Sequence, residues 1–410
     1  MTRESIQPLR TWTRADVLVA FALLVAANIG MVHRQLDTPL TTVGLVTGAI
    51  AVVLAAWWAA MSGSGLRLPA GVTMGLLVLF WLVTALVNLM VPEDLDAQAD
   101  RDDALDLATR ELVAGRDPWA VSTQIHESHH PSPAIGGILL AAPFRLVLGD
   151  SSWQNVAWVG LALCLLVWRV SAGSALAGAL LVGVSPVFWS EWIFQSDLLT
   201  LGIKFAIAML WGLWAMRSGG GVAFVLSAAL FALVLADRFI FVAFAVVVAV
   251  VALRWVPWRR AFAWLSLSGG LTIALFVIPW VLAPGYRAQM ILNASKSSEA
   301  GDLVPNAGLF LGLAMVTLAA VLGWVVRDDA GLLGSACLVT ALVVAWQVVL
   351  YSSSAGTFDA SGSLAVAYTG IMLILGIGYL VLRRGNSLTG VAYGARRMRT
   401  DEPLTAPVRG

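Results

Sequence analysis

The stretch from residue 93 to 130 holds the residue types that most often do chemistry in proteins. Its first part carries nine carboxylates, a density that no other part of the chain approaches: Glu93, Asp94, Asp96, Asp100, Asp102, Asp103, Asp106, Glu111 and Asp117. Its last part reads His126-Glu127-Ser128-His129-His130, which fits the H-E-x-x-H pattern of zinc proteases. Because acidic loops are usually solvated charge runs, both patterns depend on the elements that hold them.

The histidine pattern lacks the helix that its zinc chemistry requires. Two histidines must lie on one helical face, with the glutamate acting on a zinc-bound water. Pro131 follows His130 directly and disfavours helical backbone there, so the setting is a loop. A zinc-dependent membrane protease is therefore the weaker hypothesis; His129 and His130 either line a substrate pocket or carry only a pH-dependent charge. Cys164 and Cys337 lie in apolar runs, and we predict no metal and no cofactor.

A second group of polar residues interrupts apolar runs farther along the chain. Gln195 and Asp197 form one cluster, and Asp237 and Arg238 form another. Ionisable residues at membrane depth are costly and usually mark a site or a pathway. The plain alternative is that Asp237 and Arg238 only neutralise each other at a tight turn. Lys204 lies seven residues after Asp197 on the same helical face, and it either pairs structurally, extends toward the interface or faces a cavity.

The elements that must hold these residues are membrane helices. The chain has 410 residues, of which 59% are hydrophobic and 12% are charged, with a mean hydropathy of +0.85. Soluble domains contain about 25% charged residues. Apolar runs of about 20 residues, each long enough to cross a bilayer as a helix, recur along the chain. The composition predicts an all-α integral membrane protein that contacts the lipid bilayer, and a net charge of +1 without a basic patch indicates no nucleic acid.

We predict about 12 full spans plus one half-inserted helix. The apolar runs lie at about 15–33, 41–61, 71–91, 133–148, 153–170, 174–193, 197–216, 221–236, 238–253, 261–283, 307–326, 331–350 and 364–383. The run at 15–33 is longer than the core of a signal peptide, which favours a first span. Residues 1–383 are read as one transmembrane domain with an acidic loop at 92–132, and residues 384–410 as a disordered cytoplasmic tail.

The run at 133–148 decides the orientation of everything that follows. If it dips into the membrane and returns, the arginines of the later short loops share the cytoplasmic side, as positive residues prefer: Arg169, Arg217, Arg254, Arg259, Arg260 and Arg327. The run is also short for a span and is interrupted by Pro143 and Arg145. Half-inserted backbone persists only where protein covers it or where it lines a cavity. The topology in which the run at 133–148 dips and returns places the acidic loop and both polar clusters on the extracytoplasmic side of the cell membrane.

The acidic loop itself predicts a surface helix. Asp102 can cap a helix that runs to about Ala114, with Gly115 as its C-terminal stop. Its apolar stripe would contain Leu105, Ala108, Leu112 and Val113. Asp106 and Arg110 are four residues apart and can pair on the exposed side. An amphipathic helix of this kind would lie along the extracytoplasmic surface of the membrane.

The order of these elements resembles the GT-C membrane glycosyltransferases, and most of all glycosyltransferase family 87. The resemblance covers roughly residues 71–260 and rests on loose motifs. The first is an Asp-rich entry with a surface helix, followed by Leu112-Val113-Ala114-Gly115-Arg116-Asp117-Pro118-Trp119 and by Pro131-Ser132-Pro133, which opens an apolar stretch that ends in Pro143-Phe144. The second is Ser185-Pro186, followed by Phe194-Gln195-Ser196-Asp197-Leu198-Leu199. The chain departs from the family where Trp119 stands in place of tyrosine and Ser132 separates the two prolines, and two spans precede the segment that would be the family's first.

The resemblance implies an inverting transferase, mannosyltransferase-like, that moves a hexose or pentose from a polyprenyl-phosphate carrier to a glycan or glycolipid acceptor. A carboxylate would act as general base on the acceptor hydroxyl. By position in the motif that base lies among Asp100, Asp102 and Asp103, with the first two leading and Asp102 alternatively only a cap. Arg238 is the expected phosphate partner, with Arg287 and Lys296 as alternatives. The expected substrate-binding residues are Gln195, Asp197, Asp237, Arg238, Trp119, His129 and His130.

Two other classes of protein stay open. A transporter or flippase for a lipid-linked substrate could use the same buried charges and broken helices, although such proteins usually contain paired repeats and the sequence shows none. A scaffolding membrane protein would leave the buried charges Asp197, Lys204, Asp237 and Arg238 without a reason.

Overall fold

The computed structural model describes residues 13–36, 50, 68–91, 100–122, 131–218, 220–238, 241–299, 307–355 and 363–386. These residues form helices joined by short turns, and no strand occurs among them. The helices are α1 (Arg14–Leu36), α3 (Ala70–Met90), α4 (Asp100–Val113), α5 (Ile135–Leu148), α6 (Trp153–Arg169), α7 (Ala172–Gly183), α8 (Pro186–Ile193), α9 (Leu198–Ser218), α10 (Gly221–Leu235), α11 (Val242–Trp255), α12 (Trp258–Leu282), α13 (Pro284–Glu299), α14 (Ala307–Val325), α15 (Asp329–Ala355) and α16 (Ser363–Asn386).

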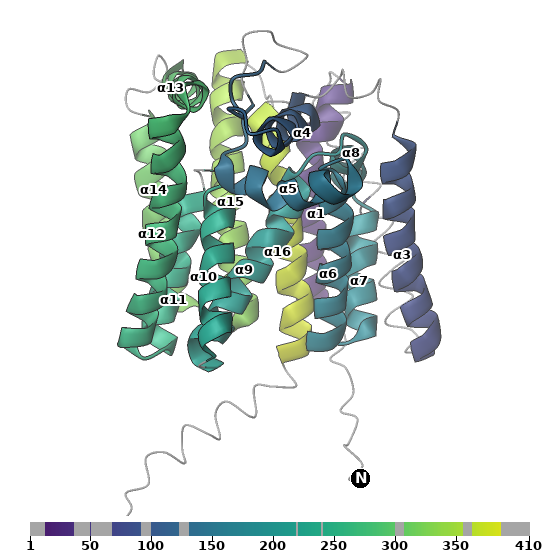
Figure 1. The fold of residues 1–410 in the computed structure, drawn as a ribbon. Helices are drawn as coiled ribbons and strands as arrows, with labels where there is room; N and C mark the ends of the chain where they lie inside the picture. Colours follow the sequence, from purple (N-terminus) through teal and green to yellow (C-terminus); the bar gives the residue numbers. More distant parts are fainter. Residues whose placement is uncertain are drawn as a thin grey trace, which may run out of the picture.

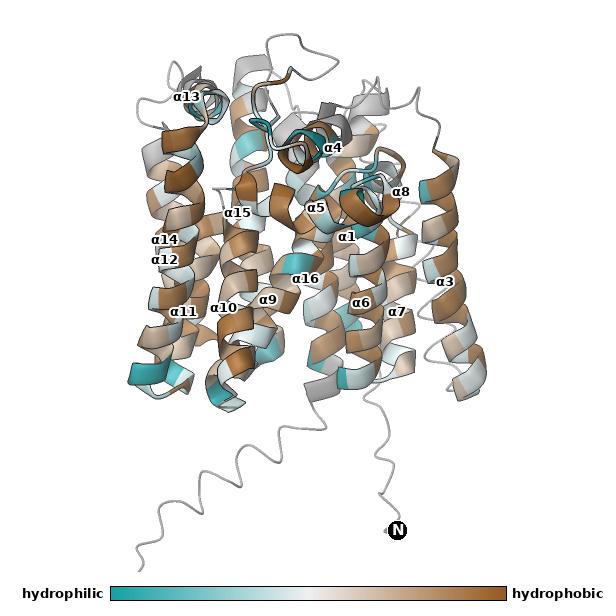
Figure 2. Ribbon diagram, viewed as in Figure 1, coloured by the Kyte–Doolittle hydropathy of each residue, from teal (hydrophilic) through white to brown (hydrophobic). Residues whose placement is uncertain are grey.

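The all-helical class predicted from the composition is confirmed. Five helices in the described ranges are long and apolar enough to cross a membrane, and the number rises to seven if each of two bent pairs counts as one span. The long helices stand side by side in a bundle (Figure 1), and apolar residues cover them along their length (Figure 2). Most of the expected run at 41–61, and the tail beyond residue 386, lie outside the described residues. The span number of 12 stays a prediction.

Arginine side chains tie several turns together at one end of the bundle. Arg169, at the end of α6, donates to Asp329 at 2.9 Å, and Arg217, near the end of α9, lies 3.9 Å from the same carboxylate. Arg254, at the end of α11, donates to the carbonyls of Gly323 and Val326 at 3.0 Å each. The arginines that were expected on one side thus gather at one end, and α4 and α13 lie across the opposite end (Figure 1).

The segment predicted to dip and return forms α5, which is short and steeply bent relative to the next helix. The axes of α5 and α6 meet at 106° across a turn of four residues. Gly149 follows the last residue of α5 and has a left-handed backbone conformation, with φ 79°. Its N–H donates a hydrogen bond to the carbonyl of Arg145. Helix α5 lies at the same end of the bundle as α4 (Figure 1), and the two helices pack against each other.

The run at 174–193, expected as one continuous span, is broken. Helix α7 ends at Gly183, and α8 restarts at Pro186 with a bend of 76° between them. Ser185 has extended backbone because a residue before proline is pushed out of the helical region, and proline is well suited to the first position of a helix. The break aims α8 across the bundle and brings the turn at residues 194–197 to the same end as α5.

Helix α4 matches its prediction at its C-terminal end but not at its start or in its ion pair. It ends at Val113, and Gly115 follows with φ 72°, as expected for a C-terminal stop. It begins at Asp100, so Asp102 is its third residue rather than its cap. The predicted pair between Asp106 and Arg110 is wrong: Asp106 accepts from Arg145 of α5 at 2.8 Å and from the Ser151 N–H at 3.0 Å.

This change of partner has a physical reason. Leu105 and Ala108 of α4 are buried against Ile138 and Ala141 of α5, so the apolar stripe of α4 faces protein. Asp106, next to that stripe, then lies over α5 and meets an arginine 39 residues away in sequence. Helix α4 is therefore docked on α5 by both apolar burial and an ion pair.

The arrangement predicts that the two ends of the bundle are exposed on opposite sides of a membrane. Ala114→Cys and Ser218→Cys, each in a background with Cys164 and Cys337 replaced by alanine, place single thiols at exposed positions of the two ends. We expect a membrane-impermeant thiol reagent to label position 114 from outside intact cells and position 218 only after permeabilisation. Labelling of both positions from one side would contradict the bundle's orientation as a membrane protein.

Candidate functional site

Three turns that are distant in sequence meet through the side chain of Arg238. They lie before α5, before α9 and between α10 and α11. Arg238 donates from one terminal nitrogen to Ser132 Oγ at 3.0 Å and from the other to Asp197 Oδ1 at 3.4 Å. Its Nε lies 3.9 Å from Oδ1 of the neighbouring Asp237. The structure thus brings together three of the residues that the sequence singled out, Asp197, Asp237 and Arg238.

The charges in this cluster are deeply buried. Asp237 and Lys204 are fully buried, and Asp197 is 1% exposed. Lys204, on α9, lies within electrostatic range of Asp237 together with Asp197 and Arg238. The cluster contains two carboxylates and two cations, so its formal charge is balanced. Only the Arg238 side chain, 13% exposed, reaches toward solvent, where it meets the exposed Ser132.

Several polar atoms of this cluster have no hydrogen-bond partner within the described part of the chain. They are Asp197 Oδ2, both carboxylate oxygens of Asp237, Lys204 Nζ and Arg238 Nε. Buried polar groups in proteins are nearly always hydrogen-bonded, and an unpartnered group deserves an explanation. Charge balance offsets part of the cost of their burial, but it does not satisfy these donors and acceptors. The cluster therefore has capacity to hold further polar atoms.

The turn that carries Asp197 is fixed by α6 rather than by the charges. Gln195 has a left-handed backbone, with φ 49°, and its carbonyl and that of Ser196 each accept from Asn155 at 3.2 Å. Thr200 donates to the oxygen of the same Asn155 side chain at 2.6 Å. The Gln195 side chain donates to the carbonyl of Asn88 on α3 at 3.3 Å. Gln195 thus shapes the turn, and its amide nitrogen is directed to α3 rather than to Arg238.

Trp119 lies in the turn that follows α4 and is buried. Its indole Nε1 donates to the carbonyl of Pro133 at 3.0 Å, and its ring packs on Tyr286 of α13 with centroids 4.7 Å apart. Asp117 holds the turn by accepting from the Trp119 N–H at 3.0 Å and from the Gly285 N–H at 3.4 Å. With 2% exposure, Trp119 holds the segment next to Ser132 rather than presenting a surface. Burial raises the pKa of Tyr286 to about 12, which keeps its hydroxyl neutral.

The remaining predicted site residues cannot be placed at the level of side chains. Asp100, Asp102 and Asp103 belong to the first turn of α4 by their backbone, but their side chains lie outside the described residues. The pattern from His126 to His130 lies outside them as well, and so do the side chain of Lys296 and any contacts it makes. Among the residues that are described, no group of three or more histidine, cysteine or carboxylate side chains could hold a metal ion.

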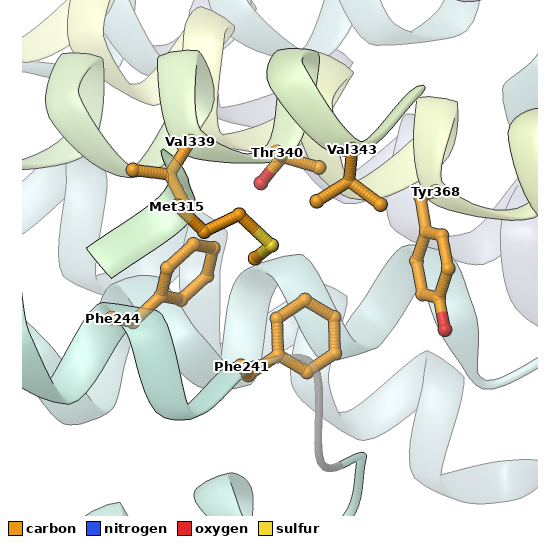
Figure 3. A pocket seen from close by; sticks show the side chains of 7 residues that line it. All are labelled: Phe241, Phe244, Met315, Val339, Thr340, Val343 and Tyr368. Carbon is orange, nitrogen blue, oxygen red and sulfur yellow. The ribbon is translucent and has the colours of Figure 1, made fainter. Parts of the chain in front are cut away.

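A small apolar recess adjoins the cluster on the side of α11, α14, α15 and α16. Figure 3 shows the side chains that line it: Phe241, Phe244, Met315, Val339, Thr340, Val343 and Tyr368. Phe241 follows Arg238 by three residues and packs edge-on against Tyr368, with centroids 5.9 Å apart. Tyr368 also interacts electrostatically with Arg238. An apolar surface therefore begins directly beside the guanidinium.

Two residues of the site had no signal that identified them in the sequence. Ser132 was noted only because it separates Pro131 from Pro133, yet it is the outer contact of Arg238. Gly137 lies against the Asp237 carboxylate, and an isolated glycine in an apolar run gives no hint of such a contact. Lys204 was singled out as a buried charge, and its place beside Asp237 follows from the helical face it shares with Asp197.

No protein-family model matches this chain, and comparisons with curated proteins and with solved structures give no match either.

The ion pair between Glu111 and Arg116, at the end of α4, predicts a pH dependence of stability. Arg116 donates to both carboxylate oxygens of Glu111, one of them at 2.8 Å, and this contact lowers the pKa of Glu111 below its ordinary value of 4.5. The folded state then binds fewer protons than the unfolded state, so the contribution is complete above about pH 4.5 and is lost as the pH falls through the lowered pKa. Thermal melts of the wild type and Glu111→Gln should differ at pH 6 and converge at lower pH. An equal difference at every pH would contradict the assignment.

Proposed function

We propose that this protein is an inverting, GT-C-type glycosyltransferase that uses a polyprenyl-phosphate-linked sugar at the extracytoplasmic face of the cell membrane. The observation that supports it best is the Arg238 guanidinium, which lies at the partly open edge of a buried charge cluster, beside an apolar recess and on the same end of the bundle as the acidic helix α4. A phosphate with a lipid chain requires such a cation next to an apolar surface.

The proposed reaction divides its tasks between two parts of this end. A carboxylate near the start of α4, Asp100 or Asp102 with Asp103 as the third candidate, removes the proton of the acceptor hydroxyl as its oxygen bonds to the anomeric carbon. The bond from that carbon to the phosphate oxygen breaks, and the carrier leaves as a phosphate monoester. Arg238 stabilises the negative charge that develops on the leaving oxygen. The sugar ends with inverted configuration because attack and departure occur on opposite faces.

The packing of α4 supports a role for its first turn. Leu105 and Ala108 bury one face of α4 on α5, and the pair of Asp106 with Arg145 fixes its rotation. The backbone of a docked helix has a fixed position, which a general base on it requires, whereas the backbone of a solvated loop does not. The acceptor, a glycan or glycolipid of the cell envelope, would enter from the side of this helix.

A transporter or flippase for a lipid-linked substrate is the second candidate. The observation that favours it is the fully buried Lys204, whose charge acts on Asp237 at a distance, because buried ionisable residues at membrane depth also serve transport. A transporter would move a polyprenyl-phosphate sugar across liposomes without releasing polyprenyl phosphate. A transferase releases it in the presence of an acceptor, so a screen of lipid-linked sugars with purified protein separates the two candidates.

Replacement of the candidate base tests the reaction directly. We expect Asp100→Asn or Asp102→Asn to lower sugar transfer by roughly 10²–10⁴-fold, with normal membrane insertion, because the general base is lost. Asp150→Asn is the matched control, since Asp150 lies at the same end but only caps the turn at Ser152. Asp103→Asn is tested beside them. If Asp100→Asn, Asp102→Asn and Asp103→Asn all transfer sugar at the wild-type rate, the general base does not lie on α4.

Arg238 variants test the phosphate contact. Arg238→Lys keeps the positive charge but loses the forked donors, and Arg238→Gln loses both. We expect a graded loss of transfer, with the glutamine variant lower by about 10²–10³-fold because a group that stabilises developing charge is absent. Initial rates at saturating donor measure the effect. Equal activity of the wild type and Arg238→Gln would exclude the phosphate contact.

A further inference from the structure

The short helix α5 begins directly against the end of α10. The N–H of Ala134 donates to the carbonyl of Asp237 at 3.1 Å, and that of Gly136 donates to the carbonyl of Ala236 at 3.1 Å. The first N–H groups of a helix and its last carbonyls lack partners within their own helix. Here the start of α5 and the end of α10 satisfy each other, which allows both helices to end inside the protein.

Two successive glycines make this contact sterically possible. A Cβ added at Gly136 would lie 2.0 Å from the carbonyl oxygen of Leu233, and one added at Gly137 would lie 2.3 Å from Asp237 Oδ1. Real Cβ atoms do not approach other atoms so closely. Gly136 therefore cannot carry a side chain while α5 keeps its place against the backbone of α10, and a side chain at Gly137 would displace the Asp237 carboxylate.

The Asp237 carboxylate lies at the first turn of α5, where the helix carries partial positive charge. It is surrounded by charges from other elements: Asp197 and Lys204 from the region of α9, and Arg238 next to it in sequence. It is fully buried, so it cannot contact a ligand from solvent. The start of α5 is held by backbone, because the Asp237 carbonyl accepts from the Ala134 N–H, and the carboxylate fills the space next to Gly137.

This contact sets the separation of two side chains at the open edge of the cluster. Ser132 lies two residues before Ala134, and Arg238 directly follows Asp237, so both are attached to the hydrogen-bonded junction. Ser132 Oγ accepts a hydrogen bond from Arg238, which leaves its own O–H proton to be donated. Ser132 is exposed, and no acceptor for this proton occurs within the described residues.

We propose that Ser132 is a second ligand for the phosphate group, donating its hydroxyl proton to a phosphate oxygen that Arg238 also binds, and that the contact between Gly137 and Asp237 positions this pair. The inference rests on the proposed use of a lipid-linked phosphate at this site. It adds a donor on the segment that leads into α5, and the two hydrogen bonds between the start of α5 and the end of α10 would hold this donor next to Arg238.

Binding of farnesyl phosphate to the purified full-length protein in detergent, measured by titration calorimetry, tests the proposal. We expect Ser132→Ala to weaken binding by about tenfold, the effect of one hydrogen bond to a charged group. Ser132→Thr retains the hydroxyl and should bind like the wild type. Inorganic phosphate is the second probe, and its binding should fall by the same factor, because the site holds the phosphate rather than the chain. A loss confined to farnesyl phosphate would overturn the assignment.

The positioning role is tested by Gly137→Ala, with Gly270→Ala of α12 as the matched control. A Cβ at Gly270 meets nothing within 4 Å, so the control adds the same methyl group in a helix without a collision. We expect Gly137→Ala to weaken farnesyl phosphate binding about as much as Ser132→Ala. The double variant should be no weaker than either single one, because both changes remove the same contact. Additive losses would contradict positioning through Ser132.

The outcomes separate this inference from the function on which it rests. Loss of binding in Arg238→Gln, with Ser132→Ala unchanged, would overturn the role of Ser132 and leave the phosphate site intact. Absence of farnesyl phosphate binding and of sugar transfer in the wild type would overturn the proposed function itself. If Gly137→Ala does not fold, the comparison of Ser132→Ala with Ser132→Thr still decides.

Discussion

The cost of burying charge in an apolar bundle is the constraint on which the arrangement of this protein depends. Asp197, Lys204, Asp237 and Arg238 lie where little or no water reaches them, and an unpaired charge there would be strongly destabilising. Two carboxylates offset two cations, and they come from the start of α9 and from the break between α10 and α11. Removing one partner would leave the others uncompensated, so these elements are held together as a unit.

Broken helices at this end follow from the same need to satisfy buried groups. Helix α5 can start inside the bundle because the final carbonyls of α10 accept its first N–H groups. The turn before α9 is possible because Asn155 donates to two of its carbonyls. Irregular backbone at membrane depth is tolerated only where protein satisfies it. Neighbouring helices, and not the charges, satisfy the irregular backbone, and this backbone carries Asp197 and Asp237 into the cluster.

The sequence predicted those features whose cause is local or collective. Pro131, Pro133 and a run too short for a span indicated an interrupted segment at 133–148, and the structure has a short helix there with a bend of 106° before α6. The placement of arginines predicted which turns share one end. Features that depend on a distant partner could not be predicted. Asp106 binds Arg145 instead of Arg110 because α4 packs its apolar stripe on α5. The need for glycine at position 137 appears only once α10 is placed against it.

Arg238 can serve both the cluster and a ligand because its guanidinium has more donors than the cluster uses. Of its five N–H groups, the structure assigns one to Ser132 and one to Asp197, the latter at the long distance of 3.4 Å, and Nε has no hydrogen bond among the described residues. Because the four charges already balance, an incoming phosphate adds net negative charge. In the proposed reaction this phosphate would compete with Asp197 for the guanidinium, and the existing contact at 3.4 Å is longer than a strong charge-assisted hydrogen bond. A shorter, bidentate pair would have bound Arg238 to the protein alone.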